Sequence, residues 1–138
     1  MKGKAHRLLC IGKIFLIRKK YKETLDRYKE ALEIEEQLGN LTNQAVMIRM
    51  IGDIFKAQEH FQEALKWYQD ASTLFEEIEN LEGNADCFES IGLVHQELGN
   101  YPEALKWNSE ALKISDQIYD DERKARILCS IGALFHKQ

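Results

Sequence analysis

Apolar residues recur along the whole chain at spacings of three and four, with polar residues between them. This spacing places the apolar side chains on one face of an α-helix, which turns once in about 3.6 residues. Short polar breaks containing asparagine, aspartate or glycine separate the runs, and these residues favour helix ends. The pattern predicts seven helices, over residues 5–19, 22–38, 42–59, 62–78, 82–98, 102–118 and 122–137.

The pattern repeats with a period of forty residues. The dipeptide Ile-Gly stands at residues 11–12, 51–52, 91–92 and 131–132, and the block Glu-Ala-Leu-Lys-Trp stands at 63–67 and again at 103–107. Such a period is typical of repeat proteins, in which each helix pair stacks on the next. We therefore expect one all-α domain with repeats over about 5–40, 41–80 and 81–120 and an unpaired last helix at 121–138. In each repeat the first helix (A) carries Ile-Gly, and the second (B) carries regularly spaced alanines.

Small residues predict where the helices approach closely. Gly52 and Gly92 on the A helices let the following B helix come near, with Ala64 and Ala104 opposite them. The predicted helix ends carry suitable residues as well. Asparagine or aspartate side chains can cap the start of a helix, glycine suits a left-handed end, and proline suits a first turn. The residues concerned are Asn40, Asn80, Asp120, Gly39, Gly99 and Pro102.

The order of slots resembles the tetratricopeptide repeat. In that family helix A carries a large residue, a Leu-Gly-like pair and an aromatic residue, and helix B alternates aromatic residues with alanines. The resemblance covers essentially the whole chain, and the forty-residue period is similar to the long repeats of kinesin light chains and Leu-Gly-Asn-repeat adaptors. Asn108 departs from it, because Tyr28 and Tyr68 occupy the equivalent slot. The resemblance implies a right-handed superhelical solenoid of antiparallel helix pairs, with three repeats plus one extra A helix.

The resemblance also implies a function. Tetratricopeptide domains bind a peptide or helix of a partner protein in a groove lined by the A helices, as scaffolds and adaptors, and they are seldom enzymes. The slots that face this groove in the family are Leu9, Lys13, Leu16, Arg49, Asp53, Lys56, Asp86, Glu89, Leu93, Gln96, Arg126, Cys129 and His136.

Two ligand modes of the family can be compared with these residues. Chaperone-binding members clamp a C-terminal carboxylate with lysine, asparagine and arginine, but among the corresponding slots only Lys13 is compatible. Those slots hold Leu9, Lys13, Met50, Asp86 and Ser90. Kinesin light chains and polarity adaptors use rows of asparagine along the A helices, and this chain has no such row. The identity of the partner therefore stays open.

Charge is unevenly distributed along the chain. Residues 1–22 carry eight basic residues and no acid, so the formal net charge of −4 leaves −12 for residues 23–138. We interpret the basic segment first as a solvated edge, and second as a contact surface for an acidic partner. The acidic remainder argues against nucleic acid. Along the groove, basic and apolar residues give way to Asp86, Glu89 and Glu97, which predicts a peptide ligand with one acidic and one basic end.

Catalytic and metal-binding patterns do not emerge from the sequence. The three cysteines are widely spaced, without a Cys-x-x-Cys pair, and the four histidines lack the i, i+4 spacing of a helical metal site. We therefore predict a protein that is not an enzyme and uses no metal or cofactor.

No apolar run approaches the length of about 18 residues that a membrane span needs, and the N-terminal pattern lacks the features of a secretory signal. These features favour a cytoplasmic location.

The last predicted helix offers an alternative function. It carries Ile127, Leu128, Ile131, Leu134 and Phe135, which are more apolar residues than one neighbouring helix can bury. Exposed apolar faces favour association. The alternative is therefore a structural assembly element, either a homo-oligomer formed through Ile127, Ile131 and Leu134 of the terminal helix or part of a longer solenoid.

Overall fold

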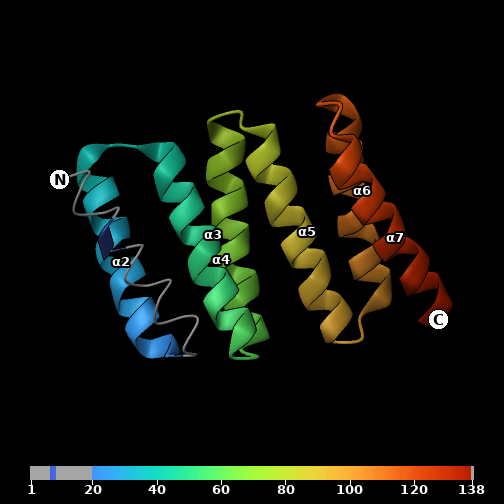
Figure 1. The fold of residues 1–138 in the computed structure, drawn as a ribbon, viewed down its shortest axis with the longest axis horizontal. Coiled ribbons are helices and arrows are strands. Elements are labelled where there is room, and N and C mark those ends of the chain that lie inside the picture. The colour runs from blue at the N-terminus through green and yellow to red at the C-terminus, as the bar shows by residue number, and fades with distance from the viewer. Residues whose placement is uncertain (1–6, 9–19, 138) are drawn as a thin grey trace. The chain divides into compact units, whose positions relative to one another are not determined.

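The computed structural model of the 138-residue chain describes residues 7–8 and 20–137, and every regular element in this part is an α-helix (Figure 1). The all-α prediction is confirmed, and the observed helix bounds differ from the predicted ones by at most two residues. The helices are α2 (Tyr21–Leu38), α3 (Leu41–Ala57), α4 (Phe61–Glu77), α5 (Leu81–Glu97), α6 (Tyr101–Gln117) and α7 (Asp121–Lys137). The predicted helix at 5–19, with Leu9, Lys13 and Leu16, lies outside the described residues apart from Arg7 and Leu8, which are helical.

The chain forms two compact units, residues 1–74 and 75–138. In the first unit α2 packs on α3, and the two run in opposite directions on either side of a turn at Gly39 and Asn40 (Figure 1). The core contains Tyr28, Ile51 and Ile54, all fully buried. The apolar faces of α2 and α3 thus form the core of this unit, as the amphipathic pattern predicted.

Gly52 lets the middle of α4 come close to α3. A Cβ atom at this position would lie 2.8 Å from Cε1 of Tyr68 and 3.3 Å from Cβ of Trp67, so only glycine leaves room for the tyrosine ring. The rings of Phe55 and Trp67 stack beside this contact with their centroids 6.2 Å apart. The predicted close approach at Gly52 is confirmed.

In the second unit α6 packs against both α5 and α7. A Cβ atom on Gly92 of α5 would lie 2.7 Å from Oδ1 of Asn108 and 3.5 Å from the backbone oxygen of Ala104. The predicted close approach of a B helix is confirmed here too. At the equivalent Gly132 of α7, a Cβ atom would meet no described atom within 4 Å.

The burial of α7 differs from the sequence-based expectation. Ile127 and Leu134 are each only 1% exposed, so they belong to the core of the second unit, while Ile131 is half-buried. Leu128 and Phe135 are 49% and 61% exposed. The packed neighbour therefore buries one stripe of α7, and the apolar surface that remains consists of different residues from those expected to mediate self-association.

Polar side chains cap three of the helices as predicted. Each accepts a hydrogen bond from the backbone N–H three residues later, which satisfies one of the free donors at the start of the helix. The bonds run from Asn43 to Asn40 (3.2 Å), from Gly83 to Asn80 (2.9 Å) and from Arg123 to Asp120 (3.0 Å). Asn100 makes no such bond, although Pro102 does occupy the first turn of α6.

The turns between helices place one residue in the left-handed region. Gly39 and Gly99 have φ values of 72° and 76°, as predicted, but Glu59, Glu79 and Tyr119 adopt positive φ in the other turns, at 63°, 58° and 58°. A Cβ atom disfavours this conformation, and glycine adopts it without strain. The forty-residue repeat therefore keeps the turn geometry even where the turn has no glycine.

Tyr119→Gly should stabilise the chain by about 0.5–1 kcal/mol, because it removes the left-handed strain. The side chain is 88% exposed, so little packing is lost with it. Tyr119→Ala is the matched control, since it removes the same ring but keeps the Cβ atom, and it should give no gain. Urea denaturation of both variants measures the difference. Equal stability of the two would contradict this explanation.

Candidate functional site

A cleft of about 110 Å³ opens between α5, α6 and α7 in the second unit. Its walls combine apolar and polar side chains from all three helices. They are Glu89 and Leu93 of α5, Asn108 of α6, and Arg126, Ile127 and Ser130 of α7. Three of them, Glu89, Leu93 and Arg126, were predicted to face a binding groove, and the structure brings these three together.

The cleft exists because of two substitutions between repeats. In the first unit Tyr68 fills the equivalent slot, and its hydroxyl donates a hydrogen bond to the Asp53 carboxylate. In the second unit Asn108 stands in place of Tyr68, and Leu93 in place of Asp53. The shorter Asn108 side chain cannot fill the space that a tyrosine ring occupies, so the slot stays open.

Asn108 is only 5% exposed, yet its amide forms no hydrogen bond with any residue that the structure describes. Its Oδ1 atom lies over Gly92, and the side chain lines the cleft. Neither atom of the amide group is among the solvent-inaccessible side-chain atoms that lack a partner, so the amide can meet water through the cleft. An amide that lines a cleft and has no protein partner is therefore available to bind a ligand.

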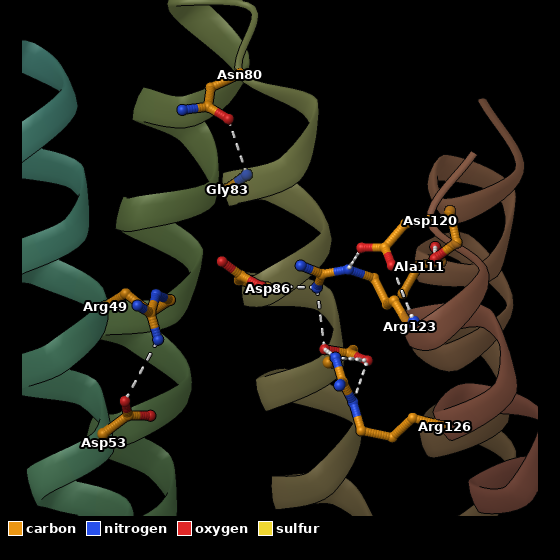
Figure 2. A network of polar contacts seen from close by, with 11 residues as sticks. Arg49, Asp53, Asn80, Gly83, Asp86, Ala111, Asp120, Arg123 and Arg126 are labelled. Carbon is orange, nitrogen blue, oxygen red and sulfur yellow. Dashed lines mark hydrogen bonds and ion pairs between the residues drawn. The ribbon is translucent and has the colours of Figure 1, made fainter. Parts of the chain in front are cut away.

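A cluster of ion pairs joins α5 to α7 beside the cleft, as Figure 2 shows. The side chain of Arg123 is only 7% exposed, and its guanidinium lies 2.6 Å from Asp86, 3.0 Å from Glu89 and 3.1 Å from Asp120. Burial acts to lower the pKa of Arg123, but the hydrogen bond and charge of Asp86, with those of Asp120 and Glu89, outweigh it and raise the pKa above its usual value. Arg123 therefore stays charged and holds three carboxylates.

Arg126 forms the outer part of the same cluster, at the mouth of the cleft. Its Nη2 atom donates to both carboxylate oxygens of Glu89 at 3.1 Å, and its Nε atom donates to one of them at 3.3 Å. These hydrogen bonds raise the pKa of Arg126, more than partial burial lowers it. Glu89 and Arg126 thus satisfy each other and present a neutralised pair to the cleft.

Arg123 occupies one of two repeat slots whose residues change from one repeat to the next. The first slot holds Glu35, Phe75 and Ser115 in successive repeats, and the second holds Asn43, Gly83 and Arg123. The Asn43 amide donates to the Glu35 carboxylate at 3.2 Å, whereas a Cβ on Gly83 would lie 2.3 Å from the ring of Phe75. The Phe75 ring therefore leaves room only for glycine at position 83. In the third repeat the first slot holds the small Ser115 and the second holds the long side chain of Arg123.

These contacts correct the expected charge of the groove. Asp86 and Glu89 were predicted to make the third repeat acidic, but both are ion-paired with arginine from α7. Their charges are largely neutralised within the chain, so the prediction of a ligand with a basic end loses its main support. Replacing them with lysine would also break the cluster, and so would not test binding alone.

The other predicted groove residues are placed as follows. In the first unit Arg49 and Asp53 form an ion pair on α3 at 3.5 Å (Figure 2), and Lys56 is half-buried on the same helix. Burial raises the pKa of Tyr28, and the charge of Asp53 raises it further. In the second unit Gln96 is half-buried on α5, and Cys129 and His136 are exposed on α7. None of the last three lines the cleft.

The sequence did not point to Asn108, Ser130 or Arg123 as site residues. Asn108 was recognised as a departure from the repeat, and a polar residue in an aromatic slot was the signal that could have identified the cleft. Ser130 does not depart from the repeat, because the equivalent residue forty positions earlier is also serine, Ser90.

Within the described residues no group of histidine, cysteine or acidic side chains could hold a metal ion. Among the described helices, none combines the length and the apolar character needed to span a membrane.

These features define a helical-repeat domain with a small cleft, lined by apolar and polar side chains, between two A helices and the B helix that separates them in sequence. The sequence pattern of the tetratricopeptide repeat matches residues 5–77 and 85–138. The chain belongs to the tetratricopeptide repeat family. No curated protein sequence matches it.

Solved structures share this fold at low sequence identity. The TPR2AB domain of yeast Sti1 in complex with pHSP90 has a TM-score of 0.83 and 15% identity, over 99% of this chain and 48% of that one. A Rap protein complexed with competence and sporulation factor has a TM-score of 0.84 and 18% identity, over 99% and 38%. BtubC (BKLC) from P. vanneervenii has a TM-score of 0.82 and 16% identity, over 96% and 55%. The chain thus spans between about a third and somewhat over half of each of these proteins.

Proposed function

We propose that this chain is a non-enzymatic interaction module that binds a peptide or helix of a partner protein, with the cleft between α5, α6 and α7 as its principal contact site. The observation that carries the proposal is the buried Asn108 amide, which lines the cleft without a hydrogen-bond partner among the described residues. The proposal includes no metal or cofactor and a cytoplasmic location.

Two of the similar structures lend support by analogy. Sti1 is recorded with pHSP90 and the Rap protein with competence and sporulation factor, so both hold a protein or peptide ligand. Tetratricopeptide domains commonly act in this way. By the same analogy, Arg49, Asp53 and Lys56 of α3 would form a contact surface of the first unit.

The proposed mode of binding differs from the carboxylate clamp. Asp86 stands at one of the clamp slots, and its carboxylate, which is already ion-paired with Arg123, offers no positive charge and no hydrogen-bond donor to a ligand carboxylate. The long repeats also favour the subtype found in kinesin light chains and Leu-Gly-Asn-repeat adaptors, although this chain lacks their asparagine rows. A single asparagine, Asn108 on a B helix, would take over part of that role.

Selection from a library of random peptides displayed on phage tests the proposal. The chain should enrich a family of related peptides, and Asn108→Tyr should not retain them. Tyrosine should fit at this position, because Tyr68 already packs on Gly52 in the preceding repeat, and the new ring would pack on Gly92 in the same way. Failure to enrich any peptide, or equal retention by the variant, would contradict the proposed function.

A second candidate function is self-assembly through α7. It is favoured by the exposed Leu128 and Phe135, and by the open surface at Gly132, where no described atom lies within 4 Å of a Cβ position. In α5 the equivalent surface is covered by α6, where Phe88 meets Trp107 with the ring centroids 5.3 Å apart.

If α7 mediates self-assembly, sedimentation velocity should show an oligomer that grows with concentration. Phe135→Glu should then shift it to the monomer, because the charge would be buried in the contact. Leu134, the residue that the sequence suggested for this test, is unsuitable because it is buried within the chain, and its replacement would disturb the fold. A monomer at all concentrations would rule this candidate out.

A further inference from the structure

We propose that the cleft between α5, α6 and α7 recognises one glutamine side chain of the bound peptide, through a hydrogen bond from the Asn108 amide to the glutamine carbonyl. The inference rests on the proposed function, since it specifies which side chain the same cleft accepts. Three properties of the cleft, its size, its polar floor and its balanced charge, lead to this ligand.

The size of the cleft limits the occupant to one side chain. Its volume of about 110 Å³ is smaller than the roughly 150 Å³ of a cavity that holds benzene, so a complete aromatic ring does not fit well. Leu93 and Ile127 provide apolar contacts along the walls. An unbranched side chain with an aliphatic stem meets both conditions. A glutamine side chain has one more methylene than asparagine for contact with these apolar walls.

The floor of the cleft requires a hydrogen-bond acceptor at the tip of the ligand side chain. The Oδ1 atom of Asn108 is the amide atom that lies nearest Gly92, and no described residue accepts a hydrogen bond from the N–H groups of this cleft-lining amide, so they can donate to an occupant. The hydroxyl of Ser130 is already committed, because it donates to the backbone oxygen of Arg126 at 3.2 Å. An apolar side chain would seal the Asn108 amide away from water without a partner, which is unfavourable. A carboxamide or a carboxylate supplies the acceptor.

The charges around the cleft decide between these two acceptors. Glu89 and Arg126 neutralise each other, and Arg123 is shared among Asp86, Glu89 and Asp120. These three carboxylates and two guanidinium groups together carry one net negative charge. A ligand carboxylate would be repelled and would lose its hydration, and a lysine would bring no acceptor for Asn108. The neutral carboxamide of glutamine satisfies the amide without these penalties.

The test uses N-acetyl N-methylamides of glutamine, asparagine, glutamate, leucine and lysine as probes, titrated into the ¹⁵N-labelled chain. The glutamine probe should bind in the millimolar range and shift the side-chain amide resonance of Asn108. The other four should bind at least about tenfold more weakly. Leucine and lysine bring no acceptor for the amide, asparagine has a shorter stem, and the carboxylate of glutamate would be repelled. Equal binding of the leucine probe, or no shift with glutamine, would overturn the inference.

Two variants separate recognition from a structural effect. Asn108→Leu should reverse the preference from the glutamine probe to the leucine probe, a change that general loosening of the fold would not produce. Lys113→Ala is the matched control and should leave the glutamine affinity unchanged within about twofold, because Lys113 is exposed on α6 and does not line the cleft. If peptides enriched from the library contain no preferred glutamine, the inference fails while the proposed function stands. If no peptide is enriched, the proposed function itself fails.

Discussion

Arg123→Met should destabilise the second unit by about 3 kcal/mol, because it leaves three carboxylates of one cluster without their shared counter-charge. This is the lower end of the range for breaking a buried ion pair, since Asp86, Glu89 and Asp120 keep some contact with water. Methionine preserves much of the side-chain volume, so the loss reports on charge more than on packing. Urea denaturation, followed by circular dichroism, measures it.

The neighbouring Lys124 provides the control for this prediction. Its ammonium group pairs with Asp116 at 2.8 Å, but both side chains are exposed. Exposed pairs contribute between about 0 and 1 kcal/mol, so Lys124→Met should have little effect. A loss for Arg123→Met no larger than that for Lys124→Met would show that the cluster does not hold α5 and α7 together.

Gly92→Leu should destabilise the second unit by about 3 kcal/mol, because the new side chain has no space between α5 and α6. Even a Cβ atom would lie 2.7 Å from Oδ1 of Asn108, and the backbone oxygen of Ala104 lies 3.5 Å away. The surrounding backbone would have to move apart, which a thermal melt should record as a clearly lower Tm.

Gly132→Leu is the matched control for this close contact. It changes the same residue of the repeat on α7, where a Cβ atom meets no described atom within 4 Å. There the substitution should be neutral or stabilise by up to about 1 kcal/mol, since leucine favours a helix more than glycine does. Equal losses at Gly92 and Gly132 would mean that the repeat register does not determine the contacts.

The helices and their close contacts could be predicted because they depend on local sequence and on a pattern that recurs. The spacing of apolar residues determined the helix bounds, and Gly52 and Gly92 could be assigned because a small residue at a fixed place in each repeat has one packing role. The turns were harder to predict. Glu59, Glu79 and Tyr119 adopt positive φ in turns where the sequence has no glycine to indicate it.

The site was harder to predict because it lies where the repeat changes. The sequence placed Glu89, Leu93 and Arg126 on one surface, but it could not show that Glu89 and Arg126 pair with each other. Nor could it show that Asn108 leaves a cleft, since that depends on how three helices meet. The apolar stripe of α7 illustrates the same limit, because it is divided between core and surface by packing that periodicity alone does not specify.

The affinity of one library-selected peptide for the parent chain and for Asn108→Tyr tests the central claim most directly. Calorimetric titration should show binding to the parent and at least about a hundredfold weaker binding to the variant, because the tyrosine ring occupies the cleft. The Tm of the variant should equal or exceed that of the parent, which shows that the fold is retained. Unchanged affinity in a folded Asn108→Tyr variant would contradict the account, because the peptide would then bind elsewhere on the chain.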